Sequence, residues 1–136
     1  MQGRRGSREL AFQLLYHLEL VKGDEKPEMD YFWQLNEVKL NLKPFAEVLA
    51  KKVLENRDRI DTLLAGASKR WSLGRMDTVS LCLLRLGACE IFYMPETPPQ
   101  VAINEAVELA KRFGPEESPS FINGILDRLL RDKTPA

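Results

Sequence analysis

The chain has 136 residues, of which twenty are basic and twenty acidic, and it contains two cysteines. This length suits one domain with a hydrophobic core, which we expect to span residues 1–136. The balanced charge excludes a general attraction to nucleic acid or membrane surfaces, and no apolar run is long enough to cross a bilayer. Because no secretion signal is recognisable either, the sequence predicts a soluble, cytoplasmic protein.

The N-terminal third carries two helical patterns. An apolar stripe from Leu10 to Leu18 predicts a first helix, which begins near Gly6 or Ser7 and stops at Gly23-Asp24. A short second helix is expected over residues 31–37. Its inward-facing residues are predicted to be Tyr31, Phe32 and Leu35.

A longer pattern follows in the middle of the chain. Pro44 suits the first position of a helix that runs to about Ala67, with a bend near Asn56. Its apolar stripe comprises Phe45, Val48, Leu49, Val53, Ile60, Leu63 and Leu64. Residues 71–76 are expected to form a connector.

The second half of the chain predicts three more elements in close succession. Asp77 or Thr78 caps a helix that runs to Tyr93 and is apolar nearly all round, which is typical of a central helix. Pro98-Pro99 then opens an amphipathic helix ended by Gly114-Pro115, and Ser118-Pro119 opens a last one. The inward stripe of the amphipathic helix includes Val101, Ile103, Ala106, Val107, Ala110 and Phe113. No strand pattern of useful length appears, so the predicted fold class is all-α.

Catalytic, cofactor and metal sites are not indicated. The chain has one histidine, lacks His/Cys metal spacing and lacks a glycine-rich phosphate-binding loop. Cys82 and Cys89 lie two helical turns apart, roughly 10 Å, which is too far for a disulfide. Both are expected to be core residues of a reducing compartment.

Local charge is less even than the total. Residues 1–8 carry Arg4, Arg5 and Arg8 and no acidic residue. On the predicted first turns of a helix these arginines could share one side, and guanidinium groups bind phosphates and stack on unpaired bases. The alternative is a solvated N-terminus without a partner, which three arginines alone do not exclude.

Three blocks of sequence together resemble a known family. The first is Arg4-Arg5-x-x-Arg8-x-x-Ala11-x-Gln13-x-Leu15-Tyr16. The second is Trp71-Ser72-Leu73-x-Arg75-Met76, followed by Leu84-Arg85-Leu86 and Glu90. The third is INEAVELAK followed by FINGILD, between residues 103 and 127. In this order and spacing they resemble the NusB family of bacterial transcription antitermination factors.

The resemblance implies a fold and a function. The family architecture is about seven helices in two roughly three-helix halves packed across each other. Its members are not enzymes. They bind boxA-type single-stranded RNA of nascent transcripts, chiefly ribosomal RNA, together with NusE, a small-subunit ribosomal protein. The complex modifies RNA polymerase so that it reads through termination signals.

For RNA contact the resemblance points to residues in both halves of the chain. The arginine-rich segment is matched by Arg4, Arg5 and Arg8, whereas Gly6 replaces a further base of some members. Arg85 matches an arginine near the RNA-facing surface. From the residues alone, Arg85 could equally form a structural ion pair, for example with Glu90 or Glu105.

The loop before the last helix is also implicated. By resemblance, Glu117 and Phe121 lie beside the RNA, where an exposed aromatic ring could stack on a base. The alternative for Phe121 is a hydrophobic contact at the helix start. Asn123 and Gly124 are expected to be structural: Asn123 would bond backbone at a helix crossing, and Gly124 would let a neighbouring helix approach closely.

NusE contact is implied for a different set. Tyr16 matches a tyrosine on the partner surface, although it could simply be a half-buried core residue. Ser80 stands where many members carry an acidic residue, so the local interface should differ here and could use Asp77 one turn earlier.

Two other functions remain compatible with the sequence. One is an accessory role in ribosomal RNA processing or modification, because a NusB-like domain also begins some ribosomal RNA cytosine methyltransferases. The other is a purely protein-binding helical adaptor in which the arginines are incidental. The sequence leaves the oligomeric state open, including whether the chain forms a homodimer.

Overall fold

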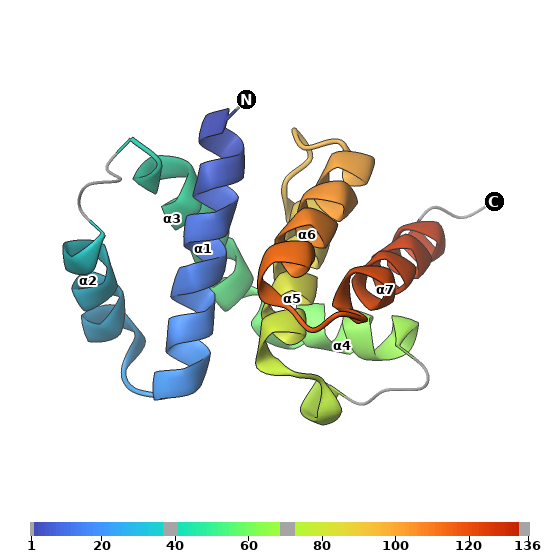
Figure 1. Cartoon of the computed structure of the whole chain (residues 1–136), viewed down its shortest axis with the longest axis horizontal. Coiled ribbons are helices and arrows are strands. Elements are labelled where there is room, and N and C mark those ends of the chain that lie inside the picture. Colours follow the sequence, from blue (N-terminus) through green and yellow to red (C-terminus); the bar gives the residue numbers. More distant parts are fainter. Residues whose placement is uncertain (1, 37–40, 69–72, 134–136) are drawn as a thin grey trace. The chain divides into compact units, whose positions relative to one another are not determined.

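In the computed structural model, residues 2–36, 41–68 and 73–133 are described, and throughout these ranges all regular elements are helical (Figure 1). This confirms the predicted all-α class. The elements are α1 (Gln2–Val21), α2 (Glu25–Leu35), α3 (Lys43–Glu55), α4 (Arg57–Ala67), the short 3-10 helix η2 (Leu73–Arg75), α5 (Thr78–Tyr93), α6 (Pro99–Phe113) and α7 (Ser118–Lys133). Among the helices of the described ranges, none has the length and apolar character needed to cross a membrane.

The chain divides into two compact units. The N-terminal unit comprises residues 1–51 and the C-terminal unit comprises residues 52–136, so the boundary falls inside α3. In the N-terminal unit, α1 buries Leu10, Ala11, Leu14 and Leu15. His17 on α1 and Glu28 on α2 are joined by a hydrogen bond of 2.9 Å between Nε2 and Oε1. Helix α1 ends before Lys22, which adopts a left-handed φ of 57°.

Helix α2 differs from its prediction. It begins at Glu25, well before residue 31, and ends at Leu35, while Glu37 lies outside the described residues. Phe32 is buried as predicted, but Tyr31 and Leu35 are 52% and 65% exposed. The buried partner of Phe32 is Trp33, whose ring meets it edge-on at a centroid distance of 5.2 Å. The predicted inward positions of Tyr31 and Leu35 were therefore wrong.

The predicted bend near Asn56 is confirmed as a break between two helices. Asn56 separates α3 from α4, and its side-chain amide donates to the carbonyl of Lys52 at 2.8 Å. That bond turns the amide back toward α3, so the side chain does not cap α4. Helix α3 starts one residue before Pro44, and Val48 is 48% exposed rather than inward.

The C-terminal unit is arranged around α5, which packs against α4, α6 and α7. Asp77 caps α5 by accepting a hydrogen bond from the Ser80 backbone N–H at 2.9 Å. From Ser80 to Ile91 all of α5 is buried except Arg85, as expected for a central helix. Gly87 lies where α6 and α7 come close: a Cβ there would be 2.6 Å from Leu126 Cδ1 and 3.5 Å from Ala106 Cβ.

Two expectations for α6 and α7 were wrong. Val101 is 40% exposed, because the first turn of α6 presents it outward. Asn123 and Gly124 are exposed on α7, and a Cβ on Gly124 would meet no atom within 4 Å. The position that requires a glycine for close helix packing is Gly87 on α5, not Gly124.

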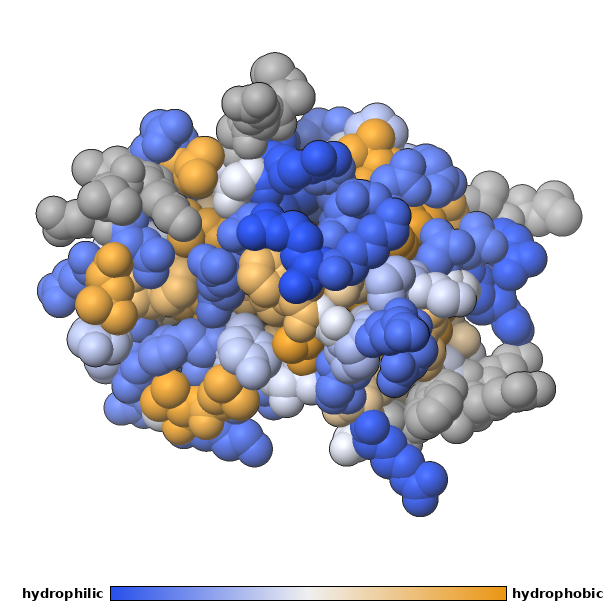
Figure 2. Space-filling view, viewed as in Figure 1, coloured by the Kyte–Doolittle hydropathy of each residue, from blue (hydrophilic) through white to orange (hydrophobic). Residues whose placement is uncertain are grey.

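The surface is mainly polar. The face seen in Figure 2 is largely hydrophilic, with hydrophobic side chains in separate small areas. The large hydrophobic residues that the structure shows as exposed are Leu20, Val21, Tyr31, Leu35, Val48 and Val101. Scattered exposure of this kind is normal for a folded domain.

Candidate nucleic-acid interface

The basic segment is helical from its start. Helix α1 begins at Gln2, so Arg4 and Arg5 lie in its first turns rather than ahead of a helix that starts near Gly6. Arg4 and Arg5 are exposed, whereas Arg8 is only 6% exposed. The three arginines are therefore not equivalent: two are accessible at the helix end, and the third is largely enclosed.

An aromatic residue of α3 lies under this segment. The Cζ atom of Arg4 is 3.9 Å from the ring centroid of Phe45, and that of Arg8 is 5.7 Å from it. Arg4 and Arg8 are one turn apart and so share the side of α1 that faces Phe45. Cation–π attraction at these distances favours an ordered arrangement of the arginine side chains.

The start of α3 is also held against α1 next to these arginines. The buried Ser7 hydroxyl donates to the Leu42 carbonyl at 2.8 Å. A Cβ on Gly6 would be 3.0 Å from Leu42 Cδ1, so a larger residue at position 6 would press on Leu42. The position of Leu42 gives a physical reason for a glycine at position 6.

Tyr16 lies two turns further along α1. It is half-buried, and its ring centroid is 5.9 Å from that of Phe12. Part of its surface is therefore accessible, while its ring packs near Phe12.

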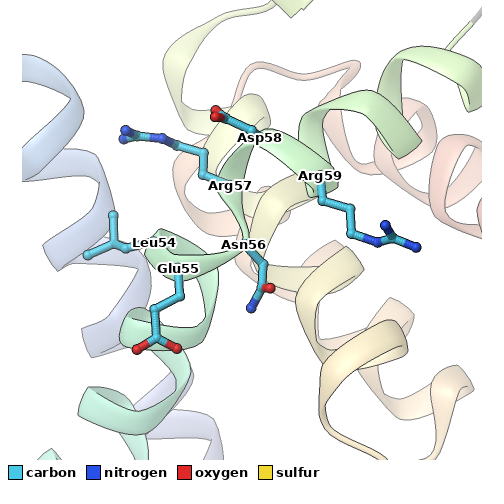
Figure 3. Close-up of a pocket in the computed structure, with 6 residues that line it drawn as sticks. All are labelled: Leu54, Glu55, Asn56, Arg57, Asp58 and Arg59. Carbon is cyan, nitrogen blue, oxygen red and sulfur yellow. The ribbon is translucent and has the colours of Figure 1, made fainter.

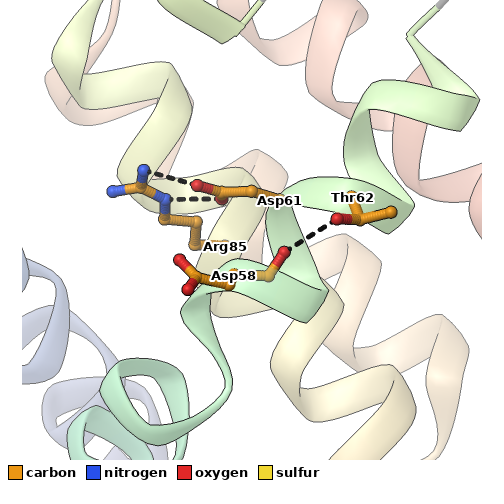
Figure 4. Close-up of polar contacts among 4 residues, drawn as sticks. All are labelled: Asp58, Asp61, Thr62 and Arg85. Carbon is orange, nitrogen blue, oxygen red and sulfur yellow. Dashed lines mark hydrogen bonds and ion pairs between the residues drawn. The ribbon is translucent and has the colours of Figure 1, made fainter.

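Arg85 is engaged by a partner that the sequence did not suggest. Its Nε and Nη2 atoms donate to the two carboxylate oxygens of Asp61 on α4, each at 2.9 Å (Figure 4). The side chains of Arg85 and Asp61 are 12% and 26% exposed. A two-bond pair of this type fixes the plane of the guanidinium group. An ion pair of Arg85 therefore exists, as expected, and it includes Asp61, which was not among the expected partners.

Four of the predicted site residues come together where α5 and α7 begin. The hydroxyls of Ser80 and Ser118 form a buried hydrogen bond of 2.7 Å, which joins the first turns of the two helices. Asp77 is exposed just before α5, and Glu117 is exposed just before α7. Phe121 is half-buried one turn into α7. Carboxylates at helix starts also stabilise the helix dipole, which is sufficient to explain both acids structurally.

Ser80 itself does not reach the surface in this structure. It is 1% exposed, and its hydroxyl is bonded to Ser118. Any contribution to partner binding from this position would have to be indirect, whereas Asp77 presents its carboxylate to solvent.

The predicted site residues thus form two groups. Arg4, Arg5, Arg8 and Tyr16 belong to the N-terminal unit. Arg85, Asp77, Ser80, Glu117 and Phe121 belong to the C-terminal unit.

Phe45 and Asp61 were missed by sequence reasoning, because each contacts its arginine from another helix. An aromatic residue near the start of a helix was visible in the sequence, but nothing there linked it to Arg4.

Other features of the described residues do not form a site. A shallow pocket at the junction of α3 and α4 is lined by Leu54, Glu55, Asn56, Arg57, Asp58 and Arg59. Figure 3 shows the side chains of Arg57, Asp58 and Arg59 pointing in different directions. Among the residues of the described ranges, no three His, Cys, Asp or Glu side chains gather in a way that could hold a metal ion.

The buried thiol of Cys89 is not a reactive group. Burial, with a smaller contribution from the charge of Glu90, raises the pKa of Cys89 to about 12, although Lys52 acts in the opposite direction. A thiol with such a pKa stays protonated near neutral pH and is a poor nucleophile.

Known proteins match along most of the chain. The model of the NusB family matches residues 5–131. The transcription antitermination protein NusB of Geobacter sulfurreducens is 45% identical over 130 residues, which cover 95% of this chain and 94% of that protein. The NusB of Myxococcus xanthus is 42% identical over 133 residues and covers 95% of each chain.

Solved structures agree with these sequence relatives. T. maritima NusB superposes with a TM-score of 0.84 at 32% identity, over 97% of this chain and 93% of that chain. The matching family model, together with relatives above 40% identity over almost the full length, settles the assignment. This chain therefore belongs to the NusB family of transcription antitermination factors, which are not enzymes.

Proposed function

We propose that this protein binds boxA-type single-stranded RNA in nascent transcripts, chiefly ribosomal RNA, jointly with the ribosomal protein NusE. The resulting complex acts on RNA polymerase in the bacterial cytoplasm so that transcription continues through termination signals. Membership of the NusB family supports this proposal. The observation that carries it is the pair of exposed arginines, Arg4 and Arg5, at the start of α1.

The proposed RNA contacts differ in kind between the two units. Arg4 and Arg5 supply accessible guanidinium groups for backbone phosphates. Phe121 is half-buried, so part of its ring is available to stack on an unpaired base beside Glu117. Arg85 contributes a guanidinium group whose plane is set by Asp61. Because the family model spans residues 5–131, we propose that both units serve one RNA-binding domain.

NusE docking is proposed for Tyr16 and Asp77, which both present accessible side-chain surface. Ser80 supports this region through its bond to Ser118, rather than through direct contact. A neutral protein with a small basic segment should bind RNA modestly by itself, and a joint surface with NusE would strengthen binding.

The test is fluorescence anisotropy of a labelled boxA-type RNA, with and without NusE, against a scrambled RNA at several salt concentrations. We expect selective binding that NusE strengthens. The double variant Arg4→Ala/Arg5→Ala should weaken binding and lower the salt slope by about 1.4, since each phosphate contact to single-stranded nucleic acid contributes about 0.7. Arg131→Ala is the matched control, because Arg131 is an exposed arginine on α7 paired with Asp127.

Two results would contradict the proposal. Equal loss of affinity in the Arg131→Ala control would mean that positive charge anywhere on the surface suffices. Absence of RNA binding with NusE still bound would make the protein an adaptor that acts through protein contacts alone.

A further inference from the structure

Phe45 stands out among the residues of the N-terminal unit because two arginines approach one ring. The guanidinium carbon of Arg4 lies 3.9 Å from the ring centroid, which is close contact, and that of Arg8 lies 5.7 Å away. Arg4 is exposed and Arg8 is enclosed. The cation nearest to the ring therefore belongs to an arginine that is exposed to solvent.

The ring is also fixed relative to α1. The bond from Ser7 to the Leu42 carbonyl holds the residue just before α3 against the first turns of α1, and the absence of a side chain at Gly6 leaves room for Leu42 there. Phe45 follows Leu42 by one helical turn. Its position under Arg4 is thus set by the packing of α3 on α1.

An ordered arginine binds an anion at a lower entropic cost. A free arginine side chain loses rotamer entropy when a ligand immobilises it. A guanidinium group stacked on a ring has already lost part of that freedom, and its N–H edge remains available for hydrogen bonds in the plane. Stacking can therefore strengthen a phosphate contact without adding charge.

We propose that Phe45 is a positioning residue for RNA binding: its ring holds the Arg4 guanidinium group in place so that the N–H edge meets an RNA phosphate. The inference rests on the proposed function, since it assigns a role within the RNA contact of the α1 arginines. Arg8 serves as the second, enclosed cation against the same ring rather than as a phosphate ligand.

A double-mutant cycle between Phe45 and Arg4 tests this role, with boxA-type RNA affinity as the readout. Phe45→Leu should weaken binding about three- to fivefold while leaving the salt slope unchanged, because every charge is still present. Arg4→Ala should weaken binding and also lower the slope. The double variant should bind no more weakly than Arg4→Ala alone, since the ring acts through Arg4.

Three further variants separate positioning from a general loss of structure. Arg4→Lys keeps the charge, removes the planar group and leaves the core untouched, so it should match the loss seen with Phe45→Leu. Phe45→Tyr keeps the ring and should retain affinity. Phe92→Leu is the matched control in the C-terminal unit, because Phe92 is half-buried with Lys133 Nζ 5.3 Å from its ring centroid. It should leave RNA affinity unchanged.

The outcomes distinguish this inference from the proposed function. Full affinity in Arg4→Lys, or additive losses in the double variant, would overturn the positioning role while RNA binding stands. Wild-type protein that fails to bind boxA-type RNA, with or without NusE, would overturn the proposed function and the inference together. Coupled losses with an unchanged Phe92→Leu control would support both.

Discussion

Replacing Gly87 with alanine should destabilise the protein, although alanine is the better helix former. Gly87 lies inside α5, where the substitution gains about 1 kcal/mol of helix propensity. The added Cβ would stand 2.6 Å from Leu126 Cδ1, a distance that forces a shift. Leu126 is fully buried, so it has little space to move, and overpacking of this kind costs about 1–3 kcal/mol. The net effect should be a loss of about 1 kcal/mol in the free energy of unfolding.

The same substitution elsewhere gives a matched control. Gly124 in α7 and Gly66 in α4 are exposed helical glycines, and a Cβ on either would meet no atom within 4 Å. Gly124→Ala and Gly66→Ala should each stabilise the protein by about 0.5–1 kcal/mol, because only helix propensity changes. The two sites should therefore differ from Gly87 by about 2 kcal/mol.

Urea unfolding followed by circular dichroism measures all three variants. Midpoints should shift in opposite directions, downward for Gly87→Ala and upward for the two controls, with unchanged m-values. If Gly87→Ala were as stable as Gly124→Ala, the close packing of α5 on α7 described for this site would be refuted. If all three variants were equally destabilised, the expected gain from the higher helix propensity of alanine would instead be refuted.

Three more stability predictions follow from single contacts. Asp61→Asn should lower the free energy of unfolding by about 1–2 kcal/mol in urea titrations, because Arg85 loses a two-bond ion pair that is only partly exposed to solvent; an unchanged midpoint would contradict this. Cys89 has a pKa raised to about 12 in the folded protein, so the folded state holds its proton more tightly and stability should fall as the pH rises from about 9 to 12. This thiol should lower the free energy of unfolding by at most about 1.4 kcal/mol per pH unit, and Cys89→Ala should lack that decrease. If the free energies of unfolding of the two proteins changed in parallel with pH, the contribution of Cys89 would be refuted. Lys22→Gly should raise the free energy of unfolding by about 1 kcal/mol in urea titrations, because a φ of 57° strains a residue with a Cβ. An unchanged free energy of unfolding would contradict that strain.

Features that depend on neighbours in the sequence were predicted well. The cap of α5 involves Asp77 and Ser80, three residues apart, and the break at Asn56 follows from local backbone chemistry. The all-α class and the central place of α5 follow from apolar periodicity. These are short-range signals, and the structure confirms them.

Features that depend on tertiary contacts were not predicted. Tyr31 and Leu35 are one turn apart and look like an inward stripe, but α2 packs through Phe32 and Trp33 instead. Periodicity shows that apolar residues share a side and cannot show which side the rest of the unit covers. The burial of Trp33 could be recognised only once the packing of α1 against α2 was known.

The same limit applies to the candidate site. The sequence identified Arg4 and Arg85 as notable cations, yet their neighbours Phe45 and Asp61 come from other helices. Resemblance to the family pointed to the arginines, and the structure adds the residues that contact them.

The burial of both cysteines has a practical consequence for spectroscopy. Cys82 and Cys89 account for every thiol of the chain, and they are 1% and 0% exposed. Maleimide dyes need an accessible thiolate, so the native protein should be nearly inert toward them. A cysteine introduced at exposed position 123 in place of Asn123 would then be the single labelling point, and neither native cysteine would have to be removed. A dye at that position on α7 could report RNA or NusE binding by energy transfer to a second dye on the RNA or on NusE, in the otherwise unaltered protein.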